Sequence, residues 1–278
     1  MQYFHDSFTT AWQAFQWICV VYCIGLAIEQ LRPAESQQPL RRIGFNIAYT
    51  FVFLLLTNLL LPPLQAVTKP WIDRFGLAIP VAFPDGPLGQ ALQVFAFFFI
   101  IDFFYYWFHR AQHTFGWLWM QHKLHHSELS LNITSGNRHH WLEEPIRVFA
   151  MWLPMGLLFQ QKPISMALPW SVLFLWGYFI HMNVRFSMGP LTSVMCGPQL
   201  HRIHHSDLRE HRDKNFAAVF PIFDILFGTY CKPAKDTYPS TGLDDGEDLN
   251  GLVRSSLAPF RGWREQLASA FKSPRAKA

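Results

Sequence analysis

Long apolar regions dominate this sequence and limit what it can fold into. Three of them run from Trp12 to Leu31, from Ile43 to Val67 and from Leu88 to Phe108, and each is close to the roughly 20 residues that a membrane-spanning helix needs. A fourth region is divided by the residues QQKP into Ile146–Phe159 and Ile164–Ile180. Half of the residues are hydrophobic and 15% are charged, compared with about 25% charged residues in average soluble proteins. The pattern predicts an all-α, multi-span helical membrane protein. Its fourth region is expected to be a helical hairpin that either makes two short spans or re-enters the membrane.

Basic residues predict how the chain is oriented. Arg32, Arg41 and Arg42 lie between the first two apolar regions, whereas the segment before the first region has no Lys or Arg. Because Lys and Arg are enriched in cytoplasmic loops, we expect this loop to be cytoplasmic. The third span then delivers residue 109 onward to the same side, where the segments that follow would form a histidine-rich helical cap on the cytoplasmic face.

The polarity of the chain divides it into three parts. Residues 1–87 are expected to be N-terminal transmembrane helices and loops, 88–235 a catalytic domain, and 236–278 a polar C-terminal tail that ends with Lys272, Arg275 and Lys277. The net charge is +4, but the basic residues do not form the stripe that nucleic-acid binding requires. The four cysteines include no C-x-x-C pair, which argues against an iron–sulfur cluster or a zinc knuckle.

Histidines form the most informative motif. Twelve of the thirteen lie between residues 109 and 211. Residues three and four apart share a helix face, so each group of histidines is expected to project its imidazoles in one direction. Imidazole is a common ligand of iron, zinc, copper and nickel, and eight imidazoles are more than one ion needs. The spacing therefore predicts two metal ions. Three boxes, HxxxH, HxxHH and HxxHH, supply the candidate ligands His109, His113, His122, His125, His126, His201, His204 and His205.

The spacing alone leaves the metal open. The boxes contain no carboxylate, which excludes the Glu-x-x-His pattern of ferritin-like di-iron proteins, and the chain has no H-E-x-x-H zinc signature. A histidine-rich zinc transporter or sensor is an alternative from another class. Such a protein would place ionisable residues along a path within its spans, and these spans carry few.

Six segments between Asp102 and Tyr230 resemble the fatty acid hydroxylase and sterol desaturase superfamily. They are DFFYYWFHRAQH, LWMQHKLHHS, HMNVRFSMGP, PQLHRIHHS, DKNF and DILFGTY. The resemblance implies a membrane oxygenase with two iron ions, O2 as co-substrate and a lipid substrate. It also implies a separate electron donor of ferredoxin or cytochrome b5 type with its reductase, and it assigns metal binding to the eight box histidines.

Two further segments, HMNVR and NRHHWLE, resemble motifs of this family. Some relatives have another HxxxH box where this chain reads HMNVR, so His181 is expected to be a ninth ligand, with Arg185 in the position of its partner. The segment NRHHWLE matches an R-x-H-x-x-E pattern through Arg138, His140 and Glu143, which makes His140 an additional candidate ligand. The neighbouring His139 is expected to be a surface residue, and His5 and His211 are expected to play no part in the site.

Several polar residues are candidates for supporting the ligands. Asp102 lies two helical turns before His109 and could accept the outer N–H of a ligand imidazole; the alternative is a residue at the end of a span that reaches water. Asp224 is a candidate of the same kind. Arg138 and Asn183 are also expected near the metal ligands. For Asn183 and for Asn215, roles in turns are equally compatible with the sequence.

The predicted reaction is O2-dependent hydroxylation of a lipid C–H bond, and desaturation at the same kind of site is the alternative. The chain lacks a G-x-G-x-x-G dinucleotide motif, so electrons must come from a separate protein. Lys123, Arg202, Arg209 and the basic tail are expected to form a docking surface for an acidic carrier.

Overall fold

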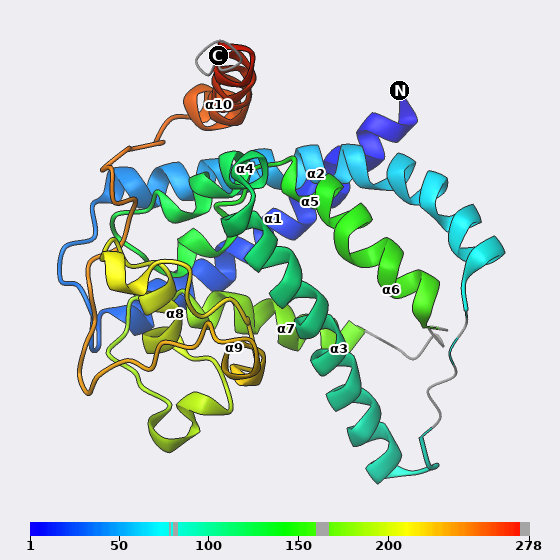
Figure 1. Cartoon of the computed structure of the whole chain (residues 1–278), viewed down its shortest axis with the longest axis horizontal. Coiled ribbons are helices and arrows are strands. Elements are labelled where there is room, and N and C mark those ends of the chain that lie inside the picture. Colours follow the sequence, from blue (N-terminus) through cyan, green and yellow to red (C-terminus); the bar gives the residue numbers. More distant parts are fainter. Residues whose placement is uncertain (78, 80–82, 160–166, 273–278) are drawn as a thin grey trace, which may run out of the picture.

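Three long apolar helices form the framework of the protein (Figure 1). The computed structural model describes residues 1–77, 79, 83–159 and 167–272, and the regular secondary structure in these ranges is helical. Helices α1 (Gln2–Glu29), α2 (Leu40–Phe75) and α3 (Pro87–Thr114) are each long and apolar enough to cross a membrane. The predicted all-helical fold is thereby confirmed, with three helices that could span a membrane.

Two of these helices extend beyond the predicted spans. Helix α3 continues past Phe108 to Thr114, so His109 and His113 lie on its last turns and not in a separate cap. Helix α2 begins at Leu40, which places Arg41 and Arg42 in its first turn. Apolar composition marks the part of a helix that lipid can cover, whereas the helix itself continues wherever its backbone hydrogen bonds continue.

The fourth apolar region consists of two helical arms. The first arm is α5 (Glu143–Arg147), a π-helical turn (Val148–Trp152) and α6 (Leu153–Leu158) in direct succession, and the second is α7 (Ala167–Ile180). The QQKP break between the arms lies outside the described residues. Helix α7 contacts both α3 and the histidine-bearing helix α8 (Pro198–His204), so this region packs beside the histidines.

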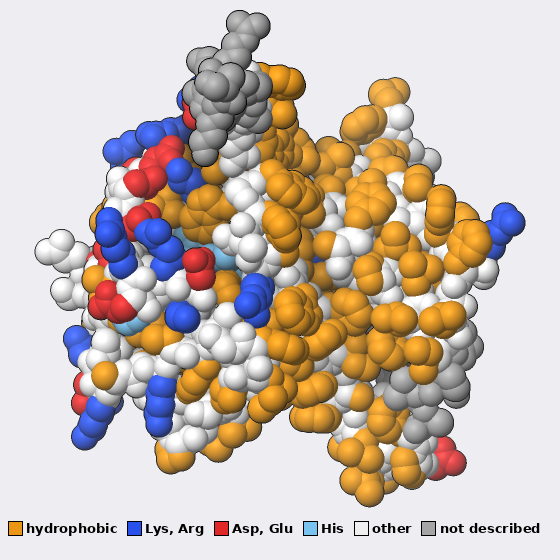
Figure 2. All heavy atoms as spheres, viewed as in Figure 1, with side chains coloured by type: hydrophobic (Ala, Val, Ile, Leu, Met, Phe, Trp, Pro, Cys, Tyr) orange, Lys and Arg blue, Asp and Glu red, His pale blue; other side chains and the backbone are white. Residues whose placement is uncertain are grey.

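Short helices and loops complete the molecule on the histidine side. They comprise α4 (Gly116–His126), α8 and α9 (Ile222–Leu226), together with α10 (Leu252–Lys272), which packs on α4. Figure 2 shows the division: hydrophobic side chains cover α2, α3 and α6, whereas Lys, Arg, Asp and Glu gather over α8, α9 and the adjoining loops. An apolar surface of this extent is typical of a surface that faces a membrane. The helices that carry the histidines lie where this apolar half meets the charged half.

Candidate metal centre

Nine histidines come together in two compact groups. Within each group, one ring nitrogen of every member lies within 4.8 Å of those of all the others. We call the first group cluster one: His109, His113, His122, His126 and His204. The second group, cluster two, contains His125, His181, His201 and His205. All nine histidines that the sequence singled out as ligands are members.

The two HxxHH boxes each divide between the clusters. Helix α4 gives His122 and His126 to cluster one and His125 to cluster two. Helix α8 does the reverse, with His204 in cluster one. Residues at positions i and i+4 are about 40° apart around a helix, whereas neighbouring residues are about 100° apart. The middle histidine therefore faces a different direction, and the prediction that a box projects all its imidazoles one way is wrong for these two boxes.

The distances between ring nitrogens suit metal ligation. The Nε2 atoms of His109 and His122 are 3.1 Å apart, and the Nε2 atom of His201 lies 3.0 Å from that of His181. Two nitrogens bound at right angles to one ion, with bonds of about 2.1 Å, lie about 3.0 Å apart. Lone pairs brought this close repel unless a proton or a cation lies between them, so the spacing fits a bound metal ion.

The outward nitrogens of several rings are held by carbonyl groups. Nδ1 of His109 donates to the Phe216 carbonyl at 2.8 Å, and Nδ1 of His204 donates to the Lys214 carbonyl at 2.7 Å. A proton fixed at Nδ1 leaves Nε2 free to bind a metal. The Nε2 atom of His204 is buried and has no hydrogen-bond partner among the described residues, as expected for a ligand atom. Burial and the neighbouring imidazoles hold the pKa of His204 and of His205 well below the usual range, which keeps these rings in the neutral form that binds metal.

Glu143 connects cluster one to a tenth imidazole. Its Oε2 atom lies 3.3 Å from Nδ1 of His122 and 3.1 Å from Nδ1 of His139, and its Oε1 atom accepts from Arg147 at 2.6 Å. The expectation that His139 is a surface residue is wrong: only 13% of its side chain is exposed. Its ring stacks on that of His125 at 4.1 Å. Attraction to the buried carboxylate four residues along the chain draws this imidazole inward.

His140, the additional candidate ligand, lies outside both clusters. Its Nε2 atom donates to the Ser256 carbonyl of α10 at 3.1 Å, and its Nδ1 atom accepts from the Leu142 N–H at 3.2 Å. Both ring nitrogens are therefore engaged, and the residue links the segment before α5 to α10. The histidines at positions 5 and 211 also lie outside the clusters.

Asp102 and Asp224 support the centre through a loop. Asp102 accepts from the backbone N–H groups of Ala218, Val219 and Phe220 at 2.6–3.2 Å. The prediction that it directly accepts from a ligand imidazole is wrong, because these three donors occupy its carboxylate. Asp224 accepts from the N–H of Phe216 at 2.7 Å. The two carboxylates thus fix the loop whose Phe216 carbonyl holds His109.

Arg138 stabilises the end of α4. Its guanidinium donates to the Leu124 carbonyl, to Ser127 Oγ and to Glu128 at 2.8–3.2 Å. This arrangement satisfies acceptor groups at the C-terminal end of the helix and fixes the helix that carries the second box.

Neither of the two asparagines touches a ligand imidazole. Asn183 hydrogen-bonds the backbone of Glu35, and Asn215 hydrogen-bonds the backbone of Cys231. Both side chains thus hold turns, in agreement with the alternative that the sequence left open. Arg202 does not belong to an exposed docking surface as predicted. It is 3% exposed, because its guanidinium is bound by the Pro239 carbonyl and by Glu35.

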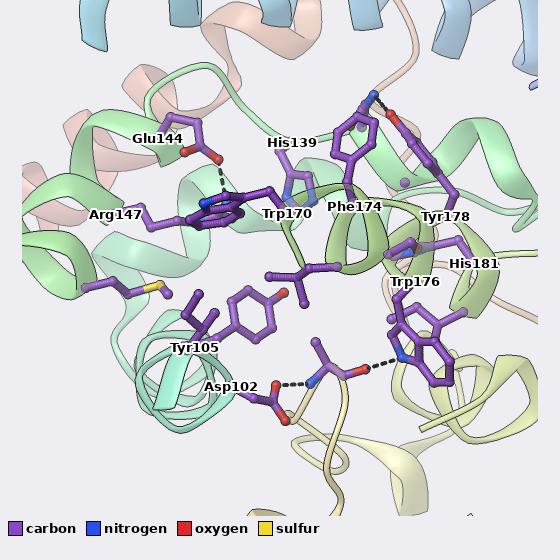
Figure 3. A pocket seen from close by; sticks show the side chains of 18 of the residues that line it. Asp102, Tyr105, His139, Glu144, Arg147, Trp170, Phe174, Trp176, Tyr178 and His181 are labelled. Carbon is purple, nitrogen blue, oxygen red and sulfur yellow. Dashed lines mark hydrogen bonds and ion pairs between the residues drawn. The ribbon is translucent and has the colours of Figure 1, made fainter. Parts of the chain in front are cut away.

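An apolar cavity of about 270 Å³ adjoins cluster two (Figure 3). His181, His201 and His139 lie on its wall, which is otherwise lined mainly by aromatic and aliphatic side chains. The Tyr105 hydroxyl points into this cavity (Figure 3), and no hydrogen bond of this hydroxyl is found among the described residues. A second cavity of about 850 Å³ lies between α2 and the α5–α6 arm. The two cavities share Glu144, Trp152 and Trp170, so they meet at these side chains.

Cluster one faces a different environment. A polar cavity of about 320 Å³ is lined by its members His113, His126 and His204. Asp207, Arg212, Asp213 and Asp244 lie on the same wall. One cluster therefore adjoins an apolar space and the other adjoins a polar space.

Comparison with known proteins agrees with this geometry. The family model for fatty acid hydroxylase matches residues 94–229, which include both clusters. This part of the chain belongs to the fatty acid hydroxylase family. The resemblance inferred from the histidine boxes is thus confirmed. None of the solved structures matches the chain significantly.

Curated relatives of this fatty acid hydroxylase domain act on several lipids according to their names. Alkylglycerol monooxygenase of Homo sapiens is 32% identical over 133 residues, which are 47% of this chain and 28% of the relative. Ornithine lipid hydroxylase OlsE of Rhizobium tropici is 29% identical over 62% of this chain and 51% of the relative. Very-long-chain aldehyde decarbonylase GL1-6 of Oryza sativa subsp. indica is 23% identical over 64% of this chain and 27% of the relative. The matched region thus spans about half of these relatives or less.

Proposed function

We propose that this protein is a membrane-bound di-iron oxygenase that hydroxylates a C–H bond of a lipid. The observation that carries the proposal is the position of cluster two at the wall of an apolar cavity beside three membrane-spanning helices. The family match supports iron as the metal and lipid as the substrate class. Cluster one would hold one ion through five imidazoles, and cluster two would hold the other through four.

The bound ions would supply activation of O2, which no side chain can supply. The protein residues would keep the ligand nitrogens unprotonated, position the imidazoles and exclude water. Glu143 and the Phe216 carbonyl would orient two ligands of cluster one, since partners of this kind fix ligand rings. No side chain is required as a nucleophile.

The substrate would bind with its oxidised carbon against cluster two. The apolar cavity shares lining residues with the larger cavity between α2 and α6, and a lipid chain would reach the site from the membrane through both. Trp152 and Trp170 lie where the cavities meet and would form its narrow point. The paired side chains of Glu144 and Arg147 (2.5 Å) would be the polar groups nearest to this passage.

Electrons would arrive at cluster one from the polar side. The polar cavity beside His113 and His126 would face the cytoplasm, in agreement with the orientation that the basic residues predict. A separate ferredoxin- or cytochrome b5-type protein with its reductase would be the donor. Oxidation of the substrate at cluster two and entry of electrons at cluster one would then take place on opposite sides of one metal centre.

The test supplies isotope-labelled O2 to cells that express the full chain and analyses their lipids by mass spectrometry. We expect lipid products with one labelled oxygen, and none from His181→Ala. Products that lack two hydrogens and carry no label would identify a desaturase instead. Unchanged lipids from a protein that holds two irons per chain and receives electrons would contradict the proposal.

A further inference from the structure

Helix α10 is attached to the metal centre but lies outside the proposed reaction. One of its faces packs on α4: Trp263 Nε1 donates to the Trp117 carbonyl at 2.7 Å, and any side chain at position 262 would overlap Met120. Ser256 of α10 accepts the hydrogen bond from His140. The helix is thus fixed to the element that carries the second histidine box.

A second face of α10 exposes a stripe of large apolar side chains. It comprises Val253, Leu257, Phe260, Leu267 and Phe271, with exposed fractions of 43–81%. Their spacing of three, four and seven residues places them on one side of the helix. This side is turned away from α4. The Phe260 ring lies beside the rings of His140 and Trp141, but Val253, Leu267 and Phe271 remain 60–81% exposed.

Arg254 and Arg261 border this stripe on one side, and Arg264 interrupts it between Phe260 and Leu267. Arg254, Arg261 and Arg264 are exposed, and Glu265 is the one acidic residue of the helix. An apolar face flanked by Lys or Arg is typical of helices that lie in a membrane surface, where the apolar side chains enter the lipid and the cations meet its headgroups. The anionic lipids of the cytoplasmic leaflet attract such cations.

The position of α10 agrees with this role. In Figure 1, α10 lies above α4, and below this place Figure 2 shows mainly apolar side chains to the right and charged side chains to the left. Helix α10 is seen almost end-on, whereas α2 and α3 run along the page. Its axis therefore crosses those of the membrane-spanning helices, as expected of a helix that lies in the plane of the membrane surface.

We infer that α10 is a membrane-surface helix that docks on anionic lipid and holds α4, with its histidines, at a fixed depth. A second copy of this chain is the competing occupant of the apolar stripe. The charge pattern favours lipid, because two copies paired through this face would bring their arginines together. The inference concerns the position of α10 and does not depend on the hydroxylation reaction.

The test incorporates an environment-sensitive fluorescent amino acid at position 267 of the full chain, in phosphatidylcholine vesicles with and without phosphatidylglycerol. Position 269 is the matched control, because Ser269 is exposed on a different side of the same helix. We expect a blue shift and quenching by lipids with doxyl-labelled chains at 267 and neither at 269. Changing Arg254, Arg261 and Arg264 to Gln should remove the dependence on phosphatidylglycerol.

Two outcomes would overturn the inference. A probe at 267 that reports water in both kinds of vesicle would show that the stripe does not enter the lipid. A blue shift that lacks quenching by doxyl-labelled lipid and grows with protein density would show that a second copy covers the stripe. Iron content, measured on every labelled sample, confirms that the metal centre is intact.

Discussion

His181 belongs to the smaller cluster, in which it is one of four imidazoles. In the matching HxxxH box of some relatives a second histidine would follow, but here Arg185 lies over the Tyr238 ring at 5.3 Å. Removal of His181 leaves three imidazoles in cluster two, whereas removal of His113 leaves four in cluster one. We expect His181→Ala to lose about one of two irons and all activity, and His113→Ala to retain more iron. Elemental analysis of purified protein measures this difference.

The control for this comparison is His211→Ala, which should keep both irons because His211 lies outside the clusters. Equal iron loss from His181→Ala and His113→Ala would show that the two clusters do not differ in this way.

Tyr105 offers a second test at the residue scale. Its hydroxyl is a free donor inside an apolar cavity, where a substrate oxygen near the oxidised carbon would accept it. Loss of one such hydrogen bond costs about 0.5–1.5 kcal/mol, so Tyr105→Phe should lower kcat/KM roughly 2- to 10-fold with unchanged iron content. Tyr106→Phe is the matched control, because the Tyr106 hydroxyl bonds Thr229 away from this cavity. Unchanged kinetics in Tyr105→Phe would mean that only apolar atoms of the substrate lie there.

Residue spacing predicted eight of the clustered histidines, and the family resemblance added His181, but neither predicted their division into two clusters. In an HxxHH box, the histidines at positions i, i+3 and i+4 could all be assigned to one helix face. Only the folded structure shows that the middle histidine, His125 or His204, belongs to the other cluster. The positions of His139 and Glu143 depend on a similar cause. Their burial follows from the fold around them, although the four-residue spacing of an imidazole and a carboxylate was a signal available in the sequence.

At the scale of elements, the loop after α8 depends on a carboxylate of α3. Asp102 accepts from three backbone N–H groups of residues 218–220. Asparagine would keep the shape but would place an NH2 group beside these donors, at a cost of about 1–3 kcal/mol. Asp102→Asn should therefore lower the melting temperature and release iron from cluster one, whose His109 is held by the same loop.

Asp6→Asn serves as the control, because the Asp6 carboxylate is 64% exposed and lies outside both clusters. It should change the melting temperature little. The role given to Asp102 would be wrong if its asparagine variant kept both the wild-type melting temperature and both irons.

The junction between α10 and the segment before α5 should respond to pH. Burial lowers the pKa of His140 from 6.5 to about 4, although its hydrogen bond to Ser256 opposes the shift. Because the folded pKa lies below the unfolded one, this stabilisation is complete above pH 6.5 and is lost as the pH falls toward 4. The loss amounts to about 3 kcal/mol below pH 4. The stability advantage of wild type over His140→Gln should shrink over this range.

Melting temperatures of the two proteins in the same detergent measure this difference. The cluster histidines titrate in both, so their contribution cancels in the comparison. A constant difference between pH 7 and pH 4 would show that His140 is not responsible.

Apolar length identified three of the principal helices in the sequence, but not where they end. The first box was placed beyond the third span because His109 begins a polar pattern, although α3 continues to Thr114. The distant partners of Asp102 and Arg138 could not be predicted, since they come from loops that approach only after folding. The amphipathic pattern of residues 252–272 is the sequence signal of α10.

The whole molecule places two different environments on one metal centre. The apolar cavity reaches cluster two and the polar cavity reaches cluster one. The sequence predicted the sidedness of the chain through its apolar regions and basic loop, but the separation of the clusters requires the folded structure. The docking surface predicted from the sequence also changes, because folding pairs or buries two of its cations. Lys123 is paired with Glu247 and Asp245, and Arg202 is buried.

Arg209 and Arg212 are therefore the exposed cations that we expect an acidic electron donor to meet. Arg212 lines the polar cavity beside cluster one; it pairs with Asp244, but 52% of its side chain is exposed, compared with 18% for Lys123. Reversal of a peripheral charge mainly slows association with a charged partner. Arg209→Glu with Arg212→Glu should raise the KM for a reduced ferredoxin, most strongly at low salt, and leave turnover with dithionite unchanged. Arg74→Glu, in the exposed last turn of α2 and away from the polar cavity, is the control. If the double variant lost turnover with both reductants, the arginines would serve the metal centre itself; if it lost neither, the donor would dock elsewhere.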